Sequence, residues 1–180
     1  MKSILLSVRP EWTKKILNGE KTIEIRKTAP KCKLPAIVYI YETGGAGVVG
    51  EFTLNEVDEF FLKGSGIKIK YSCRLRFQDD SLEKITCLPY DRLKSYLGDK
   101  KGYAWFIDDI RIYDKPKPLD SNRFLFHTQC KCYETGCNDG NCPYYQEPSY
   151  EYGEIDFDCE GHKPLTKAPQ SWCYVEELEK

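Results

Sequence analysis

The sequence predicts a mixed α+β fold, in which short strands form a small barrel accompanied by short helices. Three observations lead to this prediction. Apolar and polar residues alternate along several stretches, most regularly over residues 67–77, with the period of a half-buried strand. Glycine and proline separate these stretches. Helical signals are confined to two short stretches that begin near Pro10 and Pro89.

The N-terminal part is predicted to begin with a strand and a short helix. Pro10 suits the first turn of a helix, and Trp12 and Ile16 lie one turn apart on it. Gly19 is expected to end this helix. A glycine turn at residues 44–47 is expected to join two strands as a hairpin. The strands of this part are expected over residues 3–8, 21–27, 36–41 and 48–57.

The C-terminal part surrounds a stretch of different composition. A helix is expected over residues 89–97, and a strand over residues 103–113. Residues 119–168 are rich in Cys, Tyr, Asp, Glu, Gly and Pro and show no sustained period. The predicted organisation is a barrel of residues 1–118 and 169–180, closed by a strand over residues 171–178, with a Cys-rich insertion at residues 119–168.

Charge is distributed unevenly along the chain. The 180 residues carry a formal net charge of −1, which excludes a strong overall attraction to nucleic acid or to a membrane. Residues 1–33 contain nine Lys or Arg and three Asp or Glu, a net charge of +6. Residues 134–180 contain three basic and eleven acidic residues, a net charge of −8. An anionic ligand is therefore expected at the N-terminal part.

The apolar run at residues 4–6 is the longest candidate for a targeting signal near the start of the chain. A secretory signal needs an apolar stretch of about 7–15 residues and a membrane span about 20, so neither is expected. We expect a cytoplasmic protein without a membrane partner. In that reducing compartment, the nine cysteines should be thiols or metal ligands rather than disulfides.

Cysteines are concentrated within the predicted insertion. Residues 130–162 contain five cysteines and one histidine. This stretch is acidic and poor in Leu, Ile and Val, so a bound metal would supply folding free energy that a hydrophobic core does not. One structural zinc ion is therefore predicted, with unpaired thiols or a redox pair as alternatives. The first-choice ligands are Cys132, Cys137, Cys142 and Cys159, and Cys130 or His162 could replace one of them.

A basic stripe is predicted on the strand at residues 67–77. Four positive charges on one face of a strand could follow a nucleic-acid backbone. The alternative is an edge strand that its charges protect from aggregation, and the pattern alone favours this alternative. The stripe consists of Lys68, Lys70, Arg74 and Arg76.

Several segments of the chain, taken in order, resemble the ASCH domain family. The most specific is GEKTIEIR at residues 19–26, which is similar to the family signature of a helix end, a Gly-x-Lys turn and a strand with Glu and Arg. The other segments resemble the family's first strand and helix entry, a later core strand with its exit, and the closing strand of one bacterial and phage branch. They contain Ser7, Arg9, Pro10 and Trp12, then residues 103–107 and 114–116, and finally PQSWCYVEE at residues 169–177.

The resemblance implies a PUA-like barrel with a cleft between the first helix and the second strand, and RNA or a modified nucleotide as the ligand. Lys21 and Glu24 are then the candidate catalytic residues. A plainer alternative is that the Glu24–Arg26 pair lies on a solvated strand face, and that Trp12 packs in the core. The candidate substrate-binding residues are Ser7, Arg9, Trp12 and Arg26, where Arg26 would hold a phosphate and Trp12 would stack on a base.

Two functions remain open from the sequence. The first is a binding module that recognises RNA or a nucleotide. The second is a hydrolase of modified nucleosides or of RNA, because one bacterial branch of the family hydrolyses acetylated cytidine. That branch resembles this chain at Lys21 and Arg26 but carries a threonine nucleophile where this sequence has Glu24, which would have to activate water as a base. Replacing Lys21 or Arg26 is expected to weaken binding without lowering thermal stability.

Overall fold

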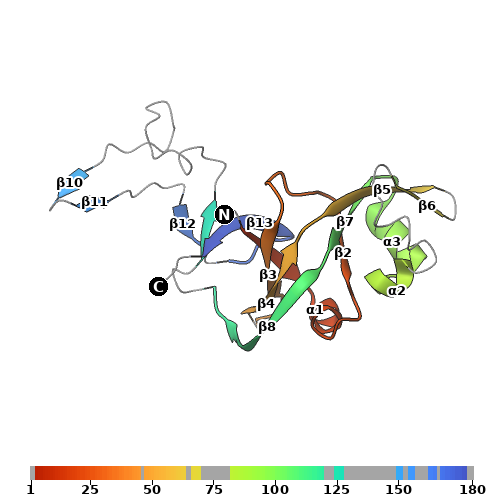
Figure 1. The fold of residues 1–180 in the computed structure, drawn as a ribbon, viewed down its shortest axis with the longest axis horizontal. Coiled ribbons are helices and arrows are strands. Elements are labelled where there is room, and N and C mark those ends of the chain that lie inside the picture. Colours follow the sequence, from red (N-terminus) through yellow and green to blue (C-terminus); the bar gives the residue numbers. More distant parts are fainter. Residues whose placement is uncertain are drawn as a thin grey trace.

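A computed structural model shows a mixed α+β fold in which sheets dominate and helices are short (Figure 1). It describes residues 3–45, 47–63, 66–69, 82–119, 124–127, 149–151, 154–156, 162–165 and 167–177. The described helices are α1 (Pro10–Leu17), α2 (Leu82–Thr86) and α3 (Tyr90–Leu97). The strands are β1 (Ser3–Val8), β2 (Ile23–Arg26), β3 (Ala36–Glu42), β4 (Gly47–Leu54), β5 (Val57–Lys63), β6 (Gly66–Ile69), β7 (Gly102–Phe106), β8 (Asp108–Lys117), β9 (Phe124–His127), β10 (Ser149–Glu151), β11 (Glu154–Asp156), β12 (His162–Pro164) and β13 (Trp172–Glu177).

The described strands pair into a large sheet, a small sheet and a separate two-stranded sheet. The large sheet has the order β12-β9-β13-β1-β3-β4-β8, the small sheet the order β2-β7-β5-β6, and β10 pairs with β11. Strand β1 is parallel to β3 and antiparallel to β13, so the C-terminal strand pairs with the first strand. The pairings of the described strands do not close into one barrel. The coarser prediction of a mixed α+β fold is confirmed.

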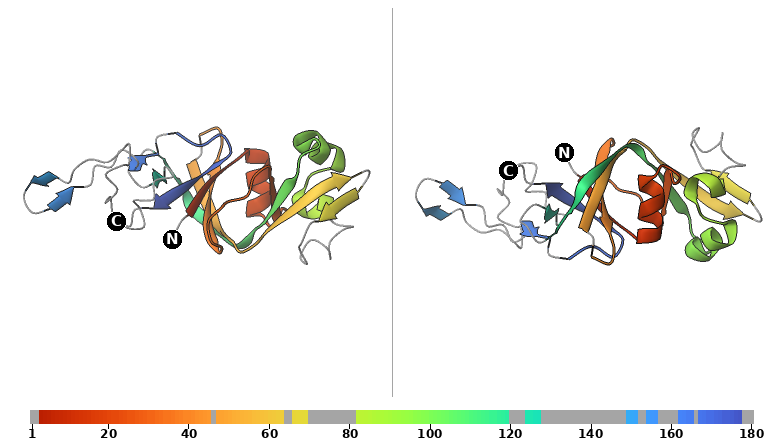
Figure 2. Two further views of the ribbon diagram at one scale, coloured as in Figure 1. Left: turned by 90° about the horizontal axis from the view of Figure 1, so that it is seen from above. Right: turned by 90° about the horizontal axis from the view of Figure 1, so that it is seen from below.

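Strand β1 is buried along its whole length because both faces of the large sheet are covered at its centre. On one face, Ile4 and Leu6 pack with Ile16 of α1 and Trp105 of β7. On the other face, Leu5 packs in a second cluster with residues of β3, β4 and β13. Helix α1 lies between the large sheet and the end of the molecule that carries α2 and α3 (Figure 2). The N-terminal segment is therefore central to the fold.

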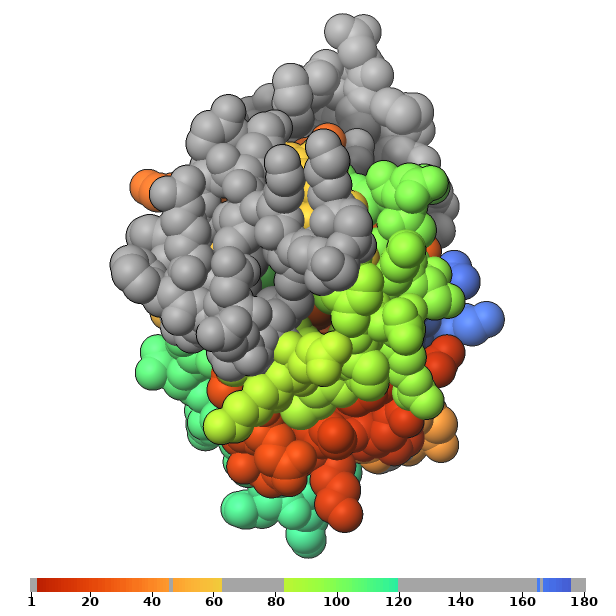
Figure 3. Space-filling view, turned by 90° about the vertical axis from the view of Figure 1, so that its right-hand side faces the viewer, coloured from red at the N-terminus to blue at the C-terminus, as the bar shows by residue number. Residues whose placement is uncertain are grey.

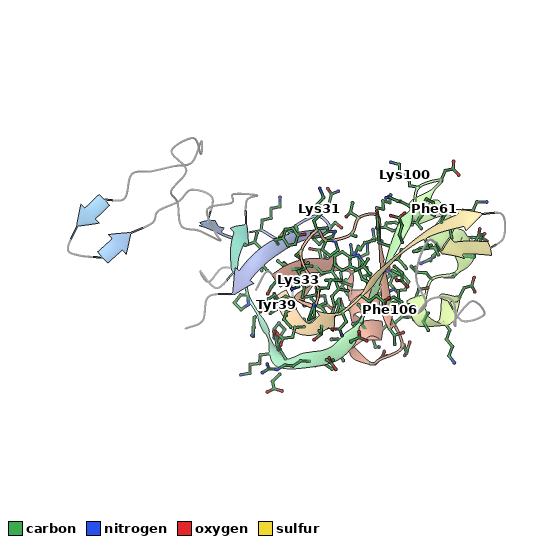
Figure 4. All side chains as sticks on the ribbon, turned by 45° about the horizontal axis from the view of Figure 1, so that its top comes forward. Lys31, Lys33, Tyr39, Phe61, Lys100 and Phe106 are labelled. Atoms are coloured by element: carbon green, nitrogen blue, oxygen red, sulfur yellow. The ribbon has the colours of Figure 1, made fainter. Side chains whose placement is uncertain are left out.

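Helix α3 covers the outer face of the small sheet. Its Leu93 and Leu97 pack on buried residues of β2 and β7. Gly102 makes this close approach possible, since a Cβ there would lie 2.6 Å from Phe60 Cζ and 2.7 Å from Leu97 Cδ1. Phe106 points into the same core (Figure 4). The yellow-green surface of α2 and α3 adjoins the red surface of the N-terminal segment (Figure 3).

Two of the predicted strands are divided differently in the structure. The strand expected over residues 48–57 ends at Leu54, and β5 begins at Val57, because the chain passes here from the large sheet to the small one. The strand expected over residues 103–113 is divided at Ile107 for the same reason, and β8 continues to Lys117. Helix α2 was not predicted. Of residues 67–77, the structure describes 67–69, which lie in β6.

Strand β8 is the last strand of the large sheet in the described part of the chain, where its neighbour is β4. Most of its residues are exposed, and Ile110 and Ile112 are 36% and 53% exposed. Pro116 fits within β8 because proline lacks a backbone N–H, and a strand at the edge of a sheet does not use every backbone N–H for pairing. The pairing with β4 shifts register at two points, which is typical of β-bulges.

The predicted insertion at residues 119–168 contributes strands to the large sheet. Strand β9 pairs with β13, and β12 pairs with β9. The division of the chain into a barrel and an insertion stays a prediction. Among the described helices, none has the length and apolar character to span a membrane.

Candidate functional site

Lys21, Glu24 and Arg26 form a charged cluster on and beside β2. Arg26 Nη2 lies 2.9 Å from Glu24 Oε1, and Lys21 Nζ lies 3.3 Å from Glu24 Oε2. The alternation of β2 turns Ile23 and Ile25 into the core beneath α3 and places the two charged residues of the strand on the opposite face. The side chains of Glu24 and Arg26 are only 10% and 11% exposed. This burial does not fit an ion pair on a solvated strand face.

Every ammonium proton of Lys21 has an acceptor. Its Nζ donates to the carbonyl oxygens of Ile23 and Thr86, at 2.8 Å and 2.6 Å, and the third proton faces Glu24. The side chain is 1% exposed. Thr86 is the last residue of α2, so Lys21 ties the strand to the end of that helix. The expectation that Lys21 can be replaced without loss of stability does not fit this arrangement.

Arg26 joins three parts of the chain. Its Nη2 donates to the carbonyl oxygen of Ser7 at 2.8 Å, and its Nη1 to Ser171 Oγ at 3.3 Å. Ser7 is the penultimate residue of β1, and Ser171 directly precedes β13, so the guanidinium connects the small sheet to the large one. Arg26 Nε is buried and has no hydrogen-bond acceptor among the described residues. The guanidinium is thus fixed in position, and its buried Nε–H is an unused donor.

Ser7 is buried, and its polar groups are engaged within the protein. Its Oγ donates to the carbonyl oxygen of Pro169 at 2.6 Å, and its N–H donates to the carbonyl oxygen of Ser171 at 2.8 Å. The carbonyl oxygen accepts from Arg26. This arrangement gives Ser7 a positioning role within the site.

Arg9 and Trp12 lie at the start of α1, as predicted. Arg9 is the N-cap residue, its side chain is exposed, and its carbonyl oxygen accepts hydrogen bonds from the N–H groups of Trp12 and Thr13, each at 2.9 Å. Trp12 is half-buried and packs on the core cluster that contains Ile16. The Nζ atoms of Lys15 and Lys21 each lie 5.7 Å from the centre of the Trp12 ring. Trp12 therefore combines a core contact with a cationic environment.

Tyr96 of α3 joins the site, although the sequence analysis did not identify it. Its ring is 40% exposed, and Lys27 Nζ lies 4.7 Å from the ring centre. Burial raises the pKa of Tyr96, while the charge of Arg26 lowers it and the charge of Glu24 raises it further. These effects are consistent with a phenol close to the charged cluster. Tyr96 directly precedes Leu97, which belongs to the buried face of α3, so Tyr96 lies at the border of that face. This position in the helical pattern is the signal by which the sequence could have indicated Tyr96.

Aromatic side chains of β7 and β13 support the segment that follows β2. The rings of Trp105 and Trp172 meet edge to face, with centres 5.5 Å apart. Both indole N–H groups donate to Thr28, from Trp105 to its carbonyl oxygen at 3.3 Å and from Trp172 to its Oγ1 at 3.0 Å. Tyr174 Oη accepts from the N–H of Cys32 at 3.1 Å. Strands β7 and β13 thus hold the loop after Arg26 in place.

A hollow of about 640 Å³ lies beside the large sheet. It is bordered by the turn between β3 and β4, the end of β8 and the segment before β13, and we call it the glycine-loop hollow. None of the predicted site residues in the described part of the chain lines it.

Several predicted site residues lie outside the described residues. These are the first-choice zinc ligands and most of the basic stripe, and Lys68 is placed by its backbone alone, in β6 opposite Phe61. Across the described ranges, no group of three or more His, Cys, Asp and Glu side chains could hold a metal. The zinc site therefore stays a prediction. The residues concerned are Cys132, Cys137, Cys142 and Cys159, and Lys70, Arg74 and Arg76.

Solved structures that are similar to this chain include three of ASCH proteins from Zymomonas mobilis. The crystal structure of ASCH from this organism has a TM-score of 0.52 at 23% identity, and the match covers 67% of this chain and 76% of that chain. A tyrosine-to-phenylalanine mutant of that protein has a TM-score of 0.51 at 23% identity, and the match covers 68% of this chain and 79% of that chain. A serine-to-alanine mutant has a TM-score of 0.51 at 24% identity, and the match covers 67% of this chain and 76% of that chain. At these identities the likeness shows the fold.

Comparison with curated proteins gives no match. A family model, described as the ASCH domain, matches residues 6–116, which contain the charged cluster, α1 and all but one residue of β8. This match covers more than half of the chain. The chain belongs to the ASCH domain family.

Proposed function

We propose that this ASCH domain binds RNA or a nucleotide at a site centred on Arg26. One observation carries the proposal. The guanidinium of Arg26 is fixed by Glu24, Ser7 and Ser171, yet its buried Nε–H has no acceptor among the described residues. A buried donor without an acceptor costs about 1–3 kcal/mol. An oxygen of a bound phosphate or base would remove that cost, and a guanidinium matches phosphate geometry better than an ammonium does.

The surroundings of Arg26 also suit a nucleotide. Tyr96 presents a ring that is 40% exposed, and Lys27 Nζ lies 4.7 Å from its centre. Trp12 is half-buried, with Lys15 close to its ring. Proteins that bind single strands combine such positive charges with aromatic rings on which bases stack, at about 1–3 kcal/mol per base.

Binding is favoured over hydrolysis by the contacts of the candidate catalytic residues. Both oxygens of Glu24 face positive groups of the protein, one toward Arg26 and one toward Lys21. The three ammonium protons of Lys21 are all engaged. A general base must reach the proton that it abstracts, and the Glu24 side chain is 10% exposed with both oxygens turned toward groups of the protein.

The experiment compares Arg26→Lys with Arg111→Lys. Binding of a fluorescent single-stranded oligoribonucleotide and of cytidine 5′-monophosphate is measured at one salt concentration. Arg111 is a matched control because its side chain is 75% exposed on β8, opposite Glu51. We expect Arg26→Lys to lower affinity by about tenfold, the equivalent of about 1.4 kcal/mol, because an ammonium cannot replace the fixed guanidinium geometry. Equal affinity in wild type and Arg26→Lys would contradict the proposal.

Turnover of acetylated cytidine, measured with the same samples, tests the hydrolase alternative. We expect no turnover by the wild type. Turnover that is lost in Glu24→Gln would make the protein a hydrolase with Glu24 as the base. Turnover that survives Glu24→Gln and is lost in Thr22→Val would instead assign the nucleophile to Thr22, which is exposed at the start of the same segment.

A further inference from the structure

The glycine-loop hollow has the size of a small-ligand site. Its volume of about 640 Å³ falls within the range of about 300–1,000 Å³ that such sites occupy. Tyr41, Gly44 and Gly45 line it from the β3–β4 turn, and Lys167 and Gln170 line it from the segment that leads into β13. Tyr41 is half-buried, whereas Lys167 and Gln170 are exposed. The hollow therefore offers an aromatic ring, an ammonium group and an amide.

Backbone borders the hollow along the turn. Gly44 and Gly45 have φ angles of +105° and +113°, which residues with a side chain rarely adopt. Apart from their chain neighbours, no atom of the described residues lies within 4 Å of where a Cβ would stand on either glycine. Gly47 lets the turn pack closely against β8, because a Cβ added at this position would lie 2.6 Å from the Lys117 carbonyl oxygen. A ligand in the hollow can thus approach the main chain of Gly44 and Gly45 directly.

A short series of contacts connects the hollow to Arg26. Pro169 lines the hollow, and its carbonyl oxygen accepts a hydrogen bond from Ser7 Oγ at 2.6 Å. The carbonyl oxygen of Ser7 and the Oγ of Ser171 both accept from Arg26, at 2.8 Å and 3.3 Å. The segment Pro169-Gln170-Ser171 therefore contributes to the wall of the hollow and also contacts the guanidinium. The two places adjoin through this one segment.

We propose that the glycine-loop hollow holds the nucleotide next to the one contacted by Arg26, so that the ligand is single-stranded RNA rather than a free nucleotide. The inference rests on the proposed function, because it extends the same site. Lys167 contacts a phosphate, and Tyr41 provides a surface for stacking. The exposed main chain of the glycine turn accommodates the sugar-phosphate backbone of the RNA strand, and such contacts do not distinguish one base from another.

The test measures affinity against ligand length. Oligocytidines from the mononucleotide to the hexanucleotide are titrated against wild type, Lys167→Glu and Gln170→Trp at several salt concentrations. We expect affinity to rise about tenfold from mononucleotide to dinucleotide, which corresponds to about 1.4 kcal/mol and lies within the range for one stacked base. Lys167→Glu should lower the affinity for oligonucleotides, reduce the salt dependence by about 0.7 in the log–log slope, and leave the mononucleotide unaffected. Gln170→Trp, which fills the hollow from an exposed position, should act in the same direction.

Lys100→Glu is the matched control. Lys100 is exposed on the turn after α3, well away from Tyr39 of β3 (Figure 4). Affinity that does not rise with length overturns the inference and leaves the proposed function in place. Length-dependent affinity that Lys167→Glu and Gln170→Trp do not change, relative to Lys100→Glu, also overturns it, since the strand then follows another path. Absence of binding by every ligand, the mononucleotide included, overturns the proposed function as well.

Discussion

Arg26 donates a hydrogen bond to the carbonyl oxygen of Ser7 at 2.8 Å, although Arg26 belongs to the small sheet and Ser7 to the large one. The acceptor is a main-chain atom, so the contact depends on where β1 ends and not on the Ser7 side chain. Glu24 holds the other side of the guanidinium at 2.9 Å. The orientation of the Arg26 side chain therefore depends on how the two sheets are placed relative to each other. A substitution far from the site can change this orientation if it moves one sheet.

Lys21→Met is expected to destabilise the protein strongly. It leaves two buried carbonyl oxygens without their donor and Glu24 with one cation fewer. Breaking a buried ion pair costs about 3–5 kcal/mol, and the lower end is expected because Arg26 still pairs with Glu24. Urea denaturation measures the free energy of unfolding. Lys14→Met, at an exposed position of α1, is the control and should change it by less than about 0.5 kcal/mol.

Tyr96→Ala is expected to weaken RNA binding, whereas Tyr96→Phe should retain most of it. The reason is that the ring supplies the stacking surface, worth about 1–3 kcal/mol per base. Because burial raises the pKa of the phenol above its ordinary value of 10.0, the hydroxyl stays protonated near neutral pH, and its loss in Tyr96→Phe does not change the charge of the site. Anisotropy titrations of both variants measure the difference. Equal affinity in wild type and Tyr96→Ala would remove Tyr96 from the site.

The Cys173 thiol is expected to react slowly with alkylating reagents. It lies on β13, is 9% exposed, and burial raises its pKa to about 12, so very little thiolate forms at neutral pH. Peptide mass spectrometry after brief treatment with iodoacetamide gives the extent of labelling at each cysteine. The half-buried Cys32 and Cys87 serve as internal references and should be labelled first. Labelling of Cys173 at the same rate in folded and urea-unfolded protein would show that the thiol is not protected.

One zinc ion per chain is expected in the stretch at residues 130–162, which lies almost entirely outside the described residues. Elemental analysis of protein purified without added metal measures the content. Removal of the metal by a chelator should make this stretch sensitive to protease before the sheets unfold, because thiolate coordination supplies its folding free energy. Protein that contains no zinc and still resists protease in this stretch would contradict the prediction.

The local pattern of apolar and polar residues was sufficient to predict those elements whose buried residues are the apolar ones. The continuous apolar run of β1, the alternation of β2 and Pro10 at the start of α1 all lie where they were predicted. The order of segments also identified the family. These features depend on residues that are close together in the chain.

The remaining features depend on contacts between distant residues. The break between β4 and β5 at Asn55 reflects a change of sheet, which no local period records. The burial of Lys21 depends on the carbonyl group of Thr86 in α2, and Tyr96 reaches the charged cluster only because Gly102 lets α3 approach the small sheet closely. A lysine in an alternating pattern is expected at the surface, so its structural role could not be predicted.

Strand β8 gives the molecule a long side along which another strand could add. Its two exposed isoleucines, Ile110 and Ile112, would favour such addition, and so would the outward-facing main chain of an edge strand. Charged residues interrupt that surface at Asp109, Arg111 and Asp114, and the register shifts against β4 bend it. Addition of a second chain along β8 is therefore opposed by the cost of removing these charged side chains from water and by the bent shape of the strand.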